Sequence, residues 1–182
     1  MQSIAKLRAI LERLADSDHY LFATRDFVPV FPSLSEPALH ALLSRAHRSG
    51  LLERVTKGIY LYPRVDYPRG LELHHTAARL RANHLNYISL ETALSDAGVI
   101  SQVPAGWVTL VSTGRSNTVA CGRFGRIEFV HTQRHARDLT GSLMYDERCR
   151  LWRANVQLAL RDMRVTQRSQ DLIDWRVVDE LV

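Results

Sequence analysis

The residues of this sequence whose types and spacing most suggest chemistry are two basic side chains just ahead of a glycine. Arg54 and Lys57 precede Gly58 within the stretch SGLLERVTKGIYLYP. The runs 51–55 and 59–62 have the apolar character of short strands, and Gly58 tolerates the positive φ that a turn between them requires. The stretch therefore predicts a basic β-hairpin, whose cations could contact the backbone of a polyanion.

A helix is expected immediately before this hairpin. Ser35 can cap its start, Pro37 fits its first turn, and Gly50 ends it. An apolar stripe recurs at helical spacing and consists of Leu39, Leu42, Leu43 and Ala46. The remaining surface is polar and mostly basic, and it carries Glu36, His40, Ser44, Arg45 and Arg48.

A basic helix followed at once by a basic hairpin is typical of a winged helix-turn-helix, in which the helix enters the major groove and the hairpin touches the DNA beside it. The candidate DNA-binding residues are Ser35, His40 and Ser44 near base edges, and Arg45, Arg48, Arg54 and Lys57 near phosphates. Each group also has a plainer interpretation. The helix arginines can simply solvate a surface, the hairpin cations can protect a sheet edge from aggregation, and His40 can be an ordinary surface residue.

Composition agrees with this interpretation without proving it. The chain has 182 residues, 46% of them hydrophobic, which suffices for one substantial core or two small ones. Its formal charge of +5 suits a polyanionic partner. Cys121 and Cys149 are far apart, so neither a disulfide framework nor a zinc site is indicated. No apolar run approaches the roughly 20 residues that span a membrane, and the N-terminus suggests an amphipathic helix rather than a signal peptide, so we expect a cytoplasmic protein.

The pattern of elements predicts an α+β chain of two domains. Residues 1–63 have the winged-helix order: a helix ending near Asp16, a strand at 20–23, a helical turn capped by Thr24, the Ser35 helix and the hairpin. The proline-containing stretch 63–70 is a linker. For the second domain, 71–182, we expect helices at 71–81, at 90–97 with Ser89 as cap, at 147–163 and at 169–181, a short strand at 87–89, and strands 106–113 and 124–132 paired antiparallel.

Other groupings of reactive side chains are weaker. His74 and His75 are adjacent, so on a helix they diverge by about 100°, and His131 and His135 straddle a strand end; neither pair predicts a metal site. The loop STGR, residues 112–115, could hold a phosphate but lacks the GxxxxGK[ST] pattern, and a turn is the preferred interpretation. Without a nucleophile–base set at recognisable spacing, we expect no catalytic residues, no cofactor and no enzyme activity.

Five segments of the sequence carry a family resemblance, in chain order: LFATRDF, LSEPALHALLSRAHRSGLLERVTKGIYLYP, NYISLETALSDAGVIS, VTLVSTGRSN and GRIEFVHT. Together they resemble the AbiEi antitoxins of type IV toxin–antitoxin systems over about residues 20–132. The KGIY end of the hairpin and the YISLETAL helix start are the most specific. The resemblance implies an N-terminal winged helix that represses its own promoter and a C-terminal domain associated with neutralising AbiEii, a nucleotidyltransferase-like toxin.

We therefore expect a transcriptional repressor that binds double-stranded operator DNA and acts as an antitoxin with a functional link to such a toxin. The alternative is a stand-alone winged-helix regulator whose second domain binds a ligand or another protein. A neighbouring toxin gene would distinguish the two.

Overall fold

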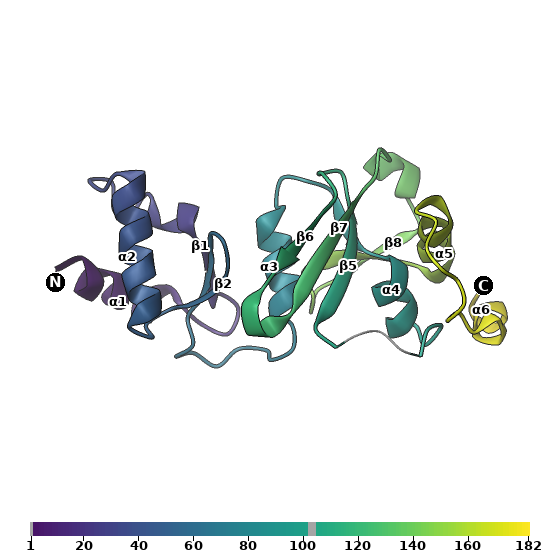
Figure 1. Cartoon of the computed structure of the whole chain (residues 1–182), viewed down its shortest axis with the longest axis horizontal. Coiled ribbons are helices and arrows are strands. Elements are labelled where there is room, and N and C mark those ends of the chain that lie inside the picture. The colour runs from purple at the N-terminus through teal and green to yellow at the C-terminus, as the bar shows by residue number, and fades with distance from the viewer. Residues whose placement is uncertain (1, 102–104) are drawn as a thin grey trace. The chain divides into compact units, whose positions relative to one another are not determined.

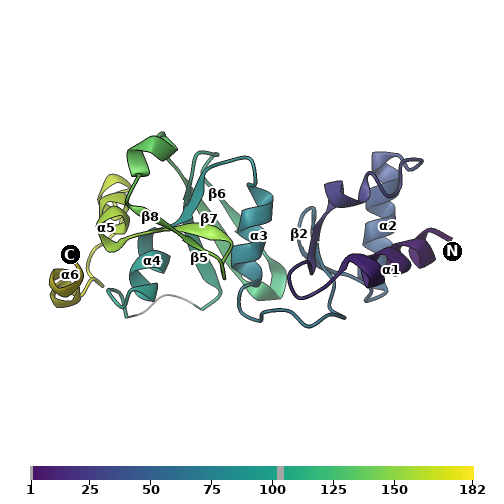
Figure 2. The same ribbon diagram turned by 180° about the vertical axis from the view of Figure 1, so that it is seen from behind.

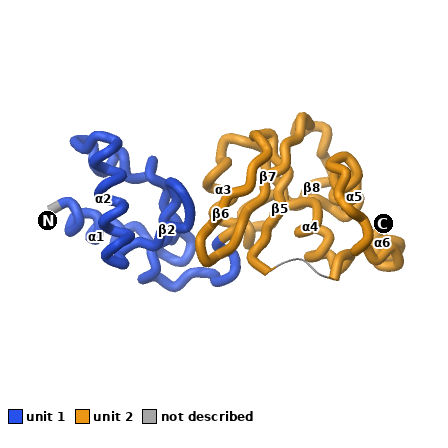
Figure 3. The backbone as a smooth tube through the Cα atoms, viewed as in Figure 1, with its two compact units in different colours: residues 1–72 blue, residues 73–182 orange. Residues whose placement is uncertain are grey.

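Two compact units make up the chain, Met1–Glu72 and Leu73–Val182 (Figure 3). The computed structural model describes residues 2–101 and 105–182. Both units contain helices and strands, so the fold is mixed α+β, as the sequence predicts (Figure 1). Among the helices of the described ranges, none has the length and apolar character needed to cross a membrane.

The first unit contains a helix, a strand, a short 3-10 helix, a second helix and a hairpin. Its elements are α1 (Gln2–Leu14), β1 (Leu21–Ala23), η1 (Thr24–Phe27), α2 (Glu36–Arg48), β2 (Glu53–Thr56) and β3 (Ile59–Leu61). The three strands pair antiparallel in the order β1-β3-β2, which leaves β2 at an edge. The elements follow one another in the order expected from the sequence.

The apolar stripes of α1 and α2 meet in the core of this unit. Leu7 and Leu11 of α1 and Leu42 and Leu43 of α2 are each 0% exposed and belong to one buried cluster. Burial of each such side chain contributes on the order of 2 kcal/mol, which fixes the rotation of α2 about its axis. The polar face of α2 is therefore held outward.

The helix ends differ in detail from the expectations. Ser35 occupies the N-cap position of α2, but its side chain accepts no capping hydrogen bond. Thr24 lies inside η1 and does not cap it; there the carboxylate of Asp26 accepts the N–H of Ala23 at 2.8 Å. The C-terminal end of α2 is as expected, because Gly50 adopts a φ of +71° and so lets the chain turn back toward the hairpin.

A six-stranded mixed sheet forms the second unit. Its strands are β4 (Asn86–Ile88), β5 (Trp107–Ser112), β6 (Asn117–Ala120), β7 (Arg126–His131), β8 (Leu143–Asp146) and β9 (Leu151–Ala154), in the order β6-β7-β5-β4-β9-β8. The helical elements are α3 (Glu72–Leu80), α4 (Leu90–Asp96), η2 (Gly122–Phe124), η3 (Ala136–Leu139), α5 (Val156–Val165) and α6 (Trp175–Leu181).

Helices cover both faces of this sheet (Figures 1 and 2). The side-chain hydroxyl oxygens of Thr109 in β5 and Thr92 in α4 lie 3.0 Å apart, so α4 lies on the face to which the Thr109 side chain points. The next residue of β5, Leu110, points to the opposite face and pairs with Phe129. The guanidinium of Arg81, which follows α3, lies 3.9 Å from the centre of the Phe129 ring. Helix α3 therefore covers the face opposite α4.

The expected antiparallel pairing of strands 106–113 and 124–132 is wrong. The corresponding strands β5 and β7 run parallel, with register from Trp107↔Arg126 to Ser112↔His131. The segment between them forms β6, which pairs antiparallel with the far side of β7. Its residues are mostly exposed, so the apolar alternation that reveals a half-buried strand is missing there.

The C-terminal helices are shorter than expected. The range 147–163 contains strand β9 and only the first part of α5, because a β8–β9 hairpin comes first and the side chain of Asn155 caps α5 by accepting the N–H of Leu158. The range 169–181 is helical only from Trp175, after the cap at Asp174. The expected helix 71–81 and strand 87–89 correspond to α3 and β4. Ser89 precedes α4 but makes no cap bond with its side chain.

Candidate nucleic-acid interface

The predicted contact residues all lie on the surface of the first unit. Exposed side chains at or along α2 are those of Ser35, His40, Ser44, Arg45 and Arg48, and those of Arg54 in β2 and Lys57 in the β2–β3 turn are exposed as well. Because the buried stripe of α2 faces the core, these helix side chains project away from it. Helix and hairpin thus form a continuous stretch of chain from residue 35 to residue 57 that bears the candidate contacts.

One side of α2 borders a shallow groove beside α1. The groove has a volume of about 440 Å³ and is lined by Ser3, Leu34, Ala38, Ala41, Ser44, Arg45 and Arg48. Small side chains line its floor along α2, so a bulky ligand can come close to the helix backbone there. The two arginines on the same groove supply positive charge. This combination suits a nucleic acid, because the edges of its bases can come close to α2 while its phosphates meet the arginines.

The hairpin holds its cations outward. Successive side chains of a strand point to opposite faces, so Val55 is buried while Arg54 is exposed, and the register of β2 against β3 shifts between Arg54 and Thr56. Gly58 has a φ of +80°, and its carbonyl accepts the N–H of Thr24 at 2.9 Å, which ties the turn to the end of β1. An L-residue would be strained at that φ, so a glycine is favoured here.

The cations of this surface are largely unpaired. Within the part of the chain that the structure describes, Arg45, Arg48 and Lys57 contact no carboxylate. The imidazole of His40 lies 3.6 Å from Glu36, one turn earlier in α2. Unpaired, solvated cations can exchange their counterions for phosphates, so this surface has the electrostatics of a DNA-binding site.

His47 is a candidate contact residue that no pattern in the sequence indicates. Its Nδ1 lies 3.2 Å from the backbone nitrogen of Arg54 and 3.3 Å from the carbonyl oxygen of Leu52. His47 thus links the last turn of α2 to the first residues of the hairpin. A histidine six positions before a strand carries no recognisable pattern, because the contact depends on the chain reversal at Gly50.

Comparison with known families was decisive for the first unit. Residues 10–63 match the family model described as a transcriptional regulator, AbiEi antitoxin. The AbiEi resemblance is confirmed by this match, and the resembling segments between residues 86 and 132 lie outside it. The match runs from within α1 to just past β3, so it contains every candidate contact residue, and it ends before the second unit begins. No curated protein matches the chain.

Outside the AbiEi match, the other predicted groupings are explained by packing. His75 Nε2 lies 2.7 Å from the carbonyl oxygen of Arg148, and burial lowers the pKa of His74. At the STGR loop, a Cβ added to Gly114 would lie 2.7 Å from a guanidinium nitrogen of Arg81, so that side chain already fills the space where a phosphate could sit. No cluster of three or more potential metal ligands occurs in residues 2–101 and 105–182.

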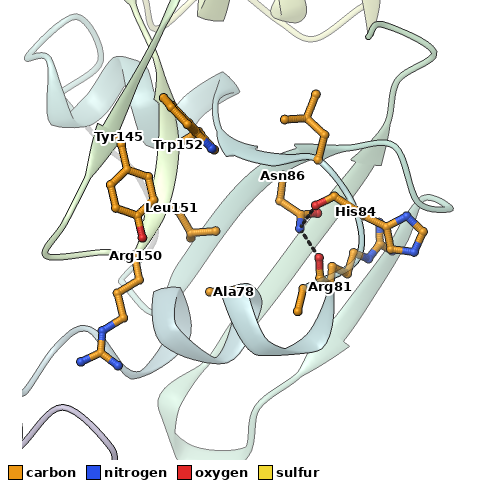
Figure 4. A pocket seen from close by; sticks show the side chains of 10 residues that line it. Ala78, Arg81, His84, Asn86, Tyr145, Arg150, Leu151 and Trp152 are labelled. Atoms are coloured by element: carbon orange, nitrogen blue, oxygen red, sulfur yellow. Dashed lines mark hydrogen bonds between the residues drawn. The ribbon is translucent and has the colours of Figure 1, made fainter. Parts of the chain in front are cut away.

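The second unit, beyond the AbiEi match, contains a cavity of about 300 Å³ between α3 and the β8–β9 hairpin (Figure 4). At its edge the rings of Tyr145 and Trp152 pack edge to face, with centroids 5.4 Å apart, and both side chains are nearly half exposed. Its polar lining includes Asn86, whose amide nitrogen donates to the carbonyls of Arg81 and His84 at 2.6 and 3.0 Å. These bonds use the amide nitrogen alone, and the buried side-chain oxygen of Asn86 has no hydrogen-bond partner among the described residues.

Proposed function

We propose that this protein is a DNA-binding transcriptional repressor that serves as the antitoxin of a type IV toxin–antitoxin pair and regulates its own operon. The observation that carries the proposal is the coincidence of the AbiEi match with the unpaired basic surface of α2 and the hairpin. We assign residues 1–63 as a winged helix-turn-helix domain and 71–182 as the antitoxin domain. Such a protein acts in the cytoplasm, where its operator lies.

In this mechanism α2 enters the major groove of double-stranded DNA. A helix with its side chains fits that groove, which is about 12 Å wide. Ser35, His40 and Ser44 then face base edges, where hydroxyl and imidazole groups can exchange hydrogen bonds with bases. Arg45 and Arg48 lie where the phosphates flank the groove.

The hairpin adds contacts beside the helix. Its two cations, Arg54 and Lys57, reach the DNA backbone next to the groove that α2 occupies. Phosphate contacts set the position of a protein on the duplex without reading its sequence. The hairpin therefore contributes affinity and orientation, and the helix contributes sequence preference.

The antitoxin part of the proposal is supported by the family description alone. The functional link to a nucleotidyltransferase-like toxin is what the sequence resemblance to the AbiEi antitoxins implies. The alternative function is that of a stand-alone regulator whose second unit binds a ligand or a protein. The exposed Tyr145 and Trp152 beside the cavity of Figure 4 are the features that favour it. The two functions differ in whether a toxin gene lies next to this one.

DNA binding is tested with the duplex upstream of the gene and a scrambled duplex of equal length. We expect tighter binding to the upstream duplex and a lower affinity of the Lys57→Ala variant for both duplexes. Equal, salt-insensitive affinity of the unaltered protein for both would contradict the repressor role.

Antitoxin function is tested by growth of cells that express the neighbouring toxin. The full-length protein should restore growth, and so should Lys57→Ala, although that variant represses its promoter more weakly. A variant that begins at Leu71, just ahead of α3, should also restore growth. If the full-length protein fails to rescue while both proteins are present, the antitoxin role is excluded and the stand-alone regulator remains.

A further inference from the structure

His47 stands at the junction of α2 and the hairpin and makes two contacts that exclude each other. Its Nδ1 is 3.2 Å from the N–H nitrogen of Arg54 and 3.3 Å from the carbonyl oxygen of Leu52. An imidazole nitrogen donates when it carries a proton and accepts when it does not. A single tautomer can therefore satisfy only one of these contacts.

The position of Arg54 in the sheet favours the tautomer in which Nδ1 accepts. Strand β2 lies at the edge of the β1-β3-β2 sheet, and the Arg54 N–H points to His47. A carbonyl oxygen has two lone pairs and tolerates a lost partner better than an N–H group does. We expect neutral His47 to accept the Arg54 N–H at Nδ1, which places the ring proton on Nε2.

This tautomer gives His47 an outward-facing donor. The His47 side chain is exposed, and among the described residues none makes a hydrogen bond or ion pair with its Nε2. His40, Ser44 and His47 are spaced by four and then three residues, so they follow one stripe of α2. That stripe includes two of the proposed base-contacting residues and ends beside the hairpin.

We propose that His47 couples the helix to the hairpin in DNA binding: its Nδ1 fixes the start of β2, and its Nε2–H donates to a phosphate of the backbone that passes between α2 and Arg54. The proposal rests on the DNA-binding function proposed above. Because the bond comes from a neutral ring, it adds affinity without displacing a counterion. His47 thereby differs from Arg45 and Arg48, whose contacts are salt-dependent.

Two substitutions separate the two ring nitrogens. In His47→Asn the side-chain amide oxygen can take the place of Nδ1, but nothing replaces Nε2–H. In His47→Gln the side-chain amide can place an N–H near the position of Nε2, but the acceptor for the Arg54 N–H is lost. Both variants carry a side-chain amide. His47→Asn keeps the contact to the Arg54 N–H, and His47→Gln keeps the donor to the phosphate.

For His47→Asn we expect DNA affinity to fall by about 10- to 150-fold, the size of one hydrogen bond to a charged group, with the salt slope unchanged. For His47→Gln we expect Arg54→Ala to weaken binding less than it does in the unaltered protein, because the hairpin is no longer held in place. Unaltered affinity of His47→Asn, or a slope lowered by about one unit, would overturn the phosphate contact. Additive effects of His47→Gln and Arg54→Ala would overturn the positioning role.

The tautomer is measured on the free protein, so it is independent of DNA binding. A long-range proton–nitrogen spectrum of the imidazole at about pH 8, where an ordinary histidine is neutral, should show the proton on Nε2 of His47. The Arg54 amide should exchange faster with solvent in His47→Gln than in His47→Asn. A proton on Nδ1, or equal exchange in both variants, would refute the coupling. If the unaltered protein has this tautomer but binds no DNA, the proposed function is refuted instead.

Discussion

Removal of the α2 arginines should change how DNA binding responds to salt. Arg45 and Arg48 are exposed and, across the described ranges, contact no carboxylate, so Arg45→Ala/Arg48→Ala removes no ion pair. Surface changes of this kind alter the free energy of unfolding by about 0.5 kcal/mol or less. A loss of DNA affinity in this variant is therefore a loss of contacts and not of fold.

The expected size of the change in salt slope follows from the number of phosphate contacts that are lost. Each phosphate contact contributes about 0.9 to the slope of log affinity against log salt, so two lost contacts lower the slope by about 1.8. Between about 50 and 200 mM salt, a slope difference of 1.8 changes the ratio of the affinity of the unaltered protein to that of the variant by about 12-fold. Removal of Arg54 and Lys57 as well doubles the slope change to about 3.6, and the ratio then changes by about 150-fold.

The assay is fluorescence anisotropy of a labelled upstream duplex and a scrambled duplex over this salt range. The slope should fall equally on both duplexes, since phosphates carry no sequence information. The matched control is Arg161→Ala/Arg164→Ala, two exposed arginines three positions apart on α5, with the same change in net charge.

Two results would refute this reasoning. An unchanged slope in the folded quadruple variant would show that these cations do not touch phosphates. An equal fall in slope for the α5 control would show that net charge alone, and not the α2 surface, governs binding.

Three further predictions concern the second unit. Arg134→Ala should destabilise the protein by about 3 kcal/mol in urea unfolding, because it leaves the carboxylate of Asp162, only 3% exposed, without its cation. Burial opposes ionisation of Asp146, but bonds from the Cys149 N–H and the Arg153 guanidinium outweigh it and lower the pKa of this carboxyl to about 2. The ionised carboxylate therefore stabilises the folded protein at pH values above the pKa of an aspartate in the unfolded chain, near 4, and this contribution is lost as the pH falls to about 2. Asp146→Asn should thus destabilise the protein at pH 7 and have no effect near pH 2. Burial raises the pKa of the Cys149 thiol to about 11, so this thiol should react with an aromatic disulfide reagent only when the protein unfolds.

The sequence sufficed to predict the first unit because its signals are local. The spacing of the α2 leucines selects the buried face of the helix, and Gly58 with its positive φ marks the hairpin turn. Both features depend on residues only a few positions apart. The exposed positions of the helix and hairpin then follow from the buried ones.

The errors in the second unit arise where structure depends on distant partners. Strand β6 is a mostly exposed edge strand, so it lacks the apolar alternation of strands with a buried face. The β8–β9 hairpin turns at Arg150, which has a φ of +57°. Glycine or asparagine usually indicates such a conformation in a sequence, and neither occurs in this turn. His47 was missed for a related reason, since its partner Arg54 N–H comes within reach only after the chain reverses at Gly50.

Arginine has two physical roles in this chain, and they can be separated. Three arginines of the second unit join segments far apart in the sequence through carboxylates, and each is mostly buried: Arg134 to Asp162, Arg153 to Asp96 and Asp146, and Arg168 to Glu91 and Glu128. Their positive charge is already neutralised, so it adds nothing to phosphate binding. The net charge of +5 is therefore a poor guide to where DNA binds.

The two roles respond in opposite ways to substitution. Loss of a paired arginine leaves its carboxylate partner without a cation and lowers stability, most strongly for Arg134 because Asp162 is buried, while the salt slope of DNA binding stays the same. Loss of an unpaired arginine of α2 lowers the slope and leaves stability nearly unchanged. Because the two measurements are independent, alanine substitution of each arginine in turn would map the DNA-binding surface directly. We expect the residues that lower the slope to fall within 45–57, inside the AbiEi match.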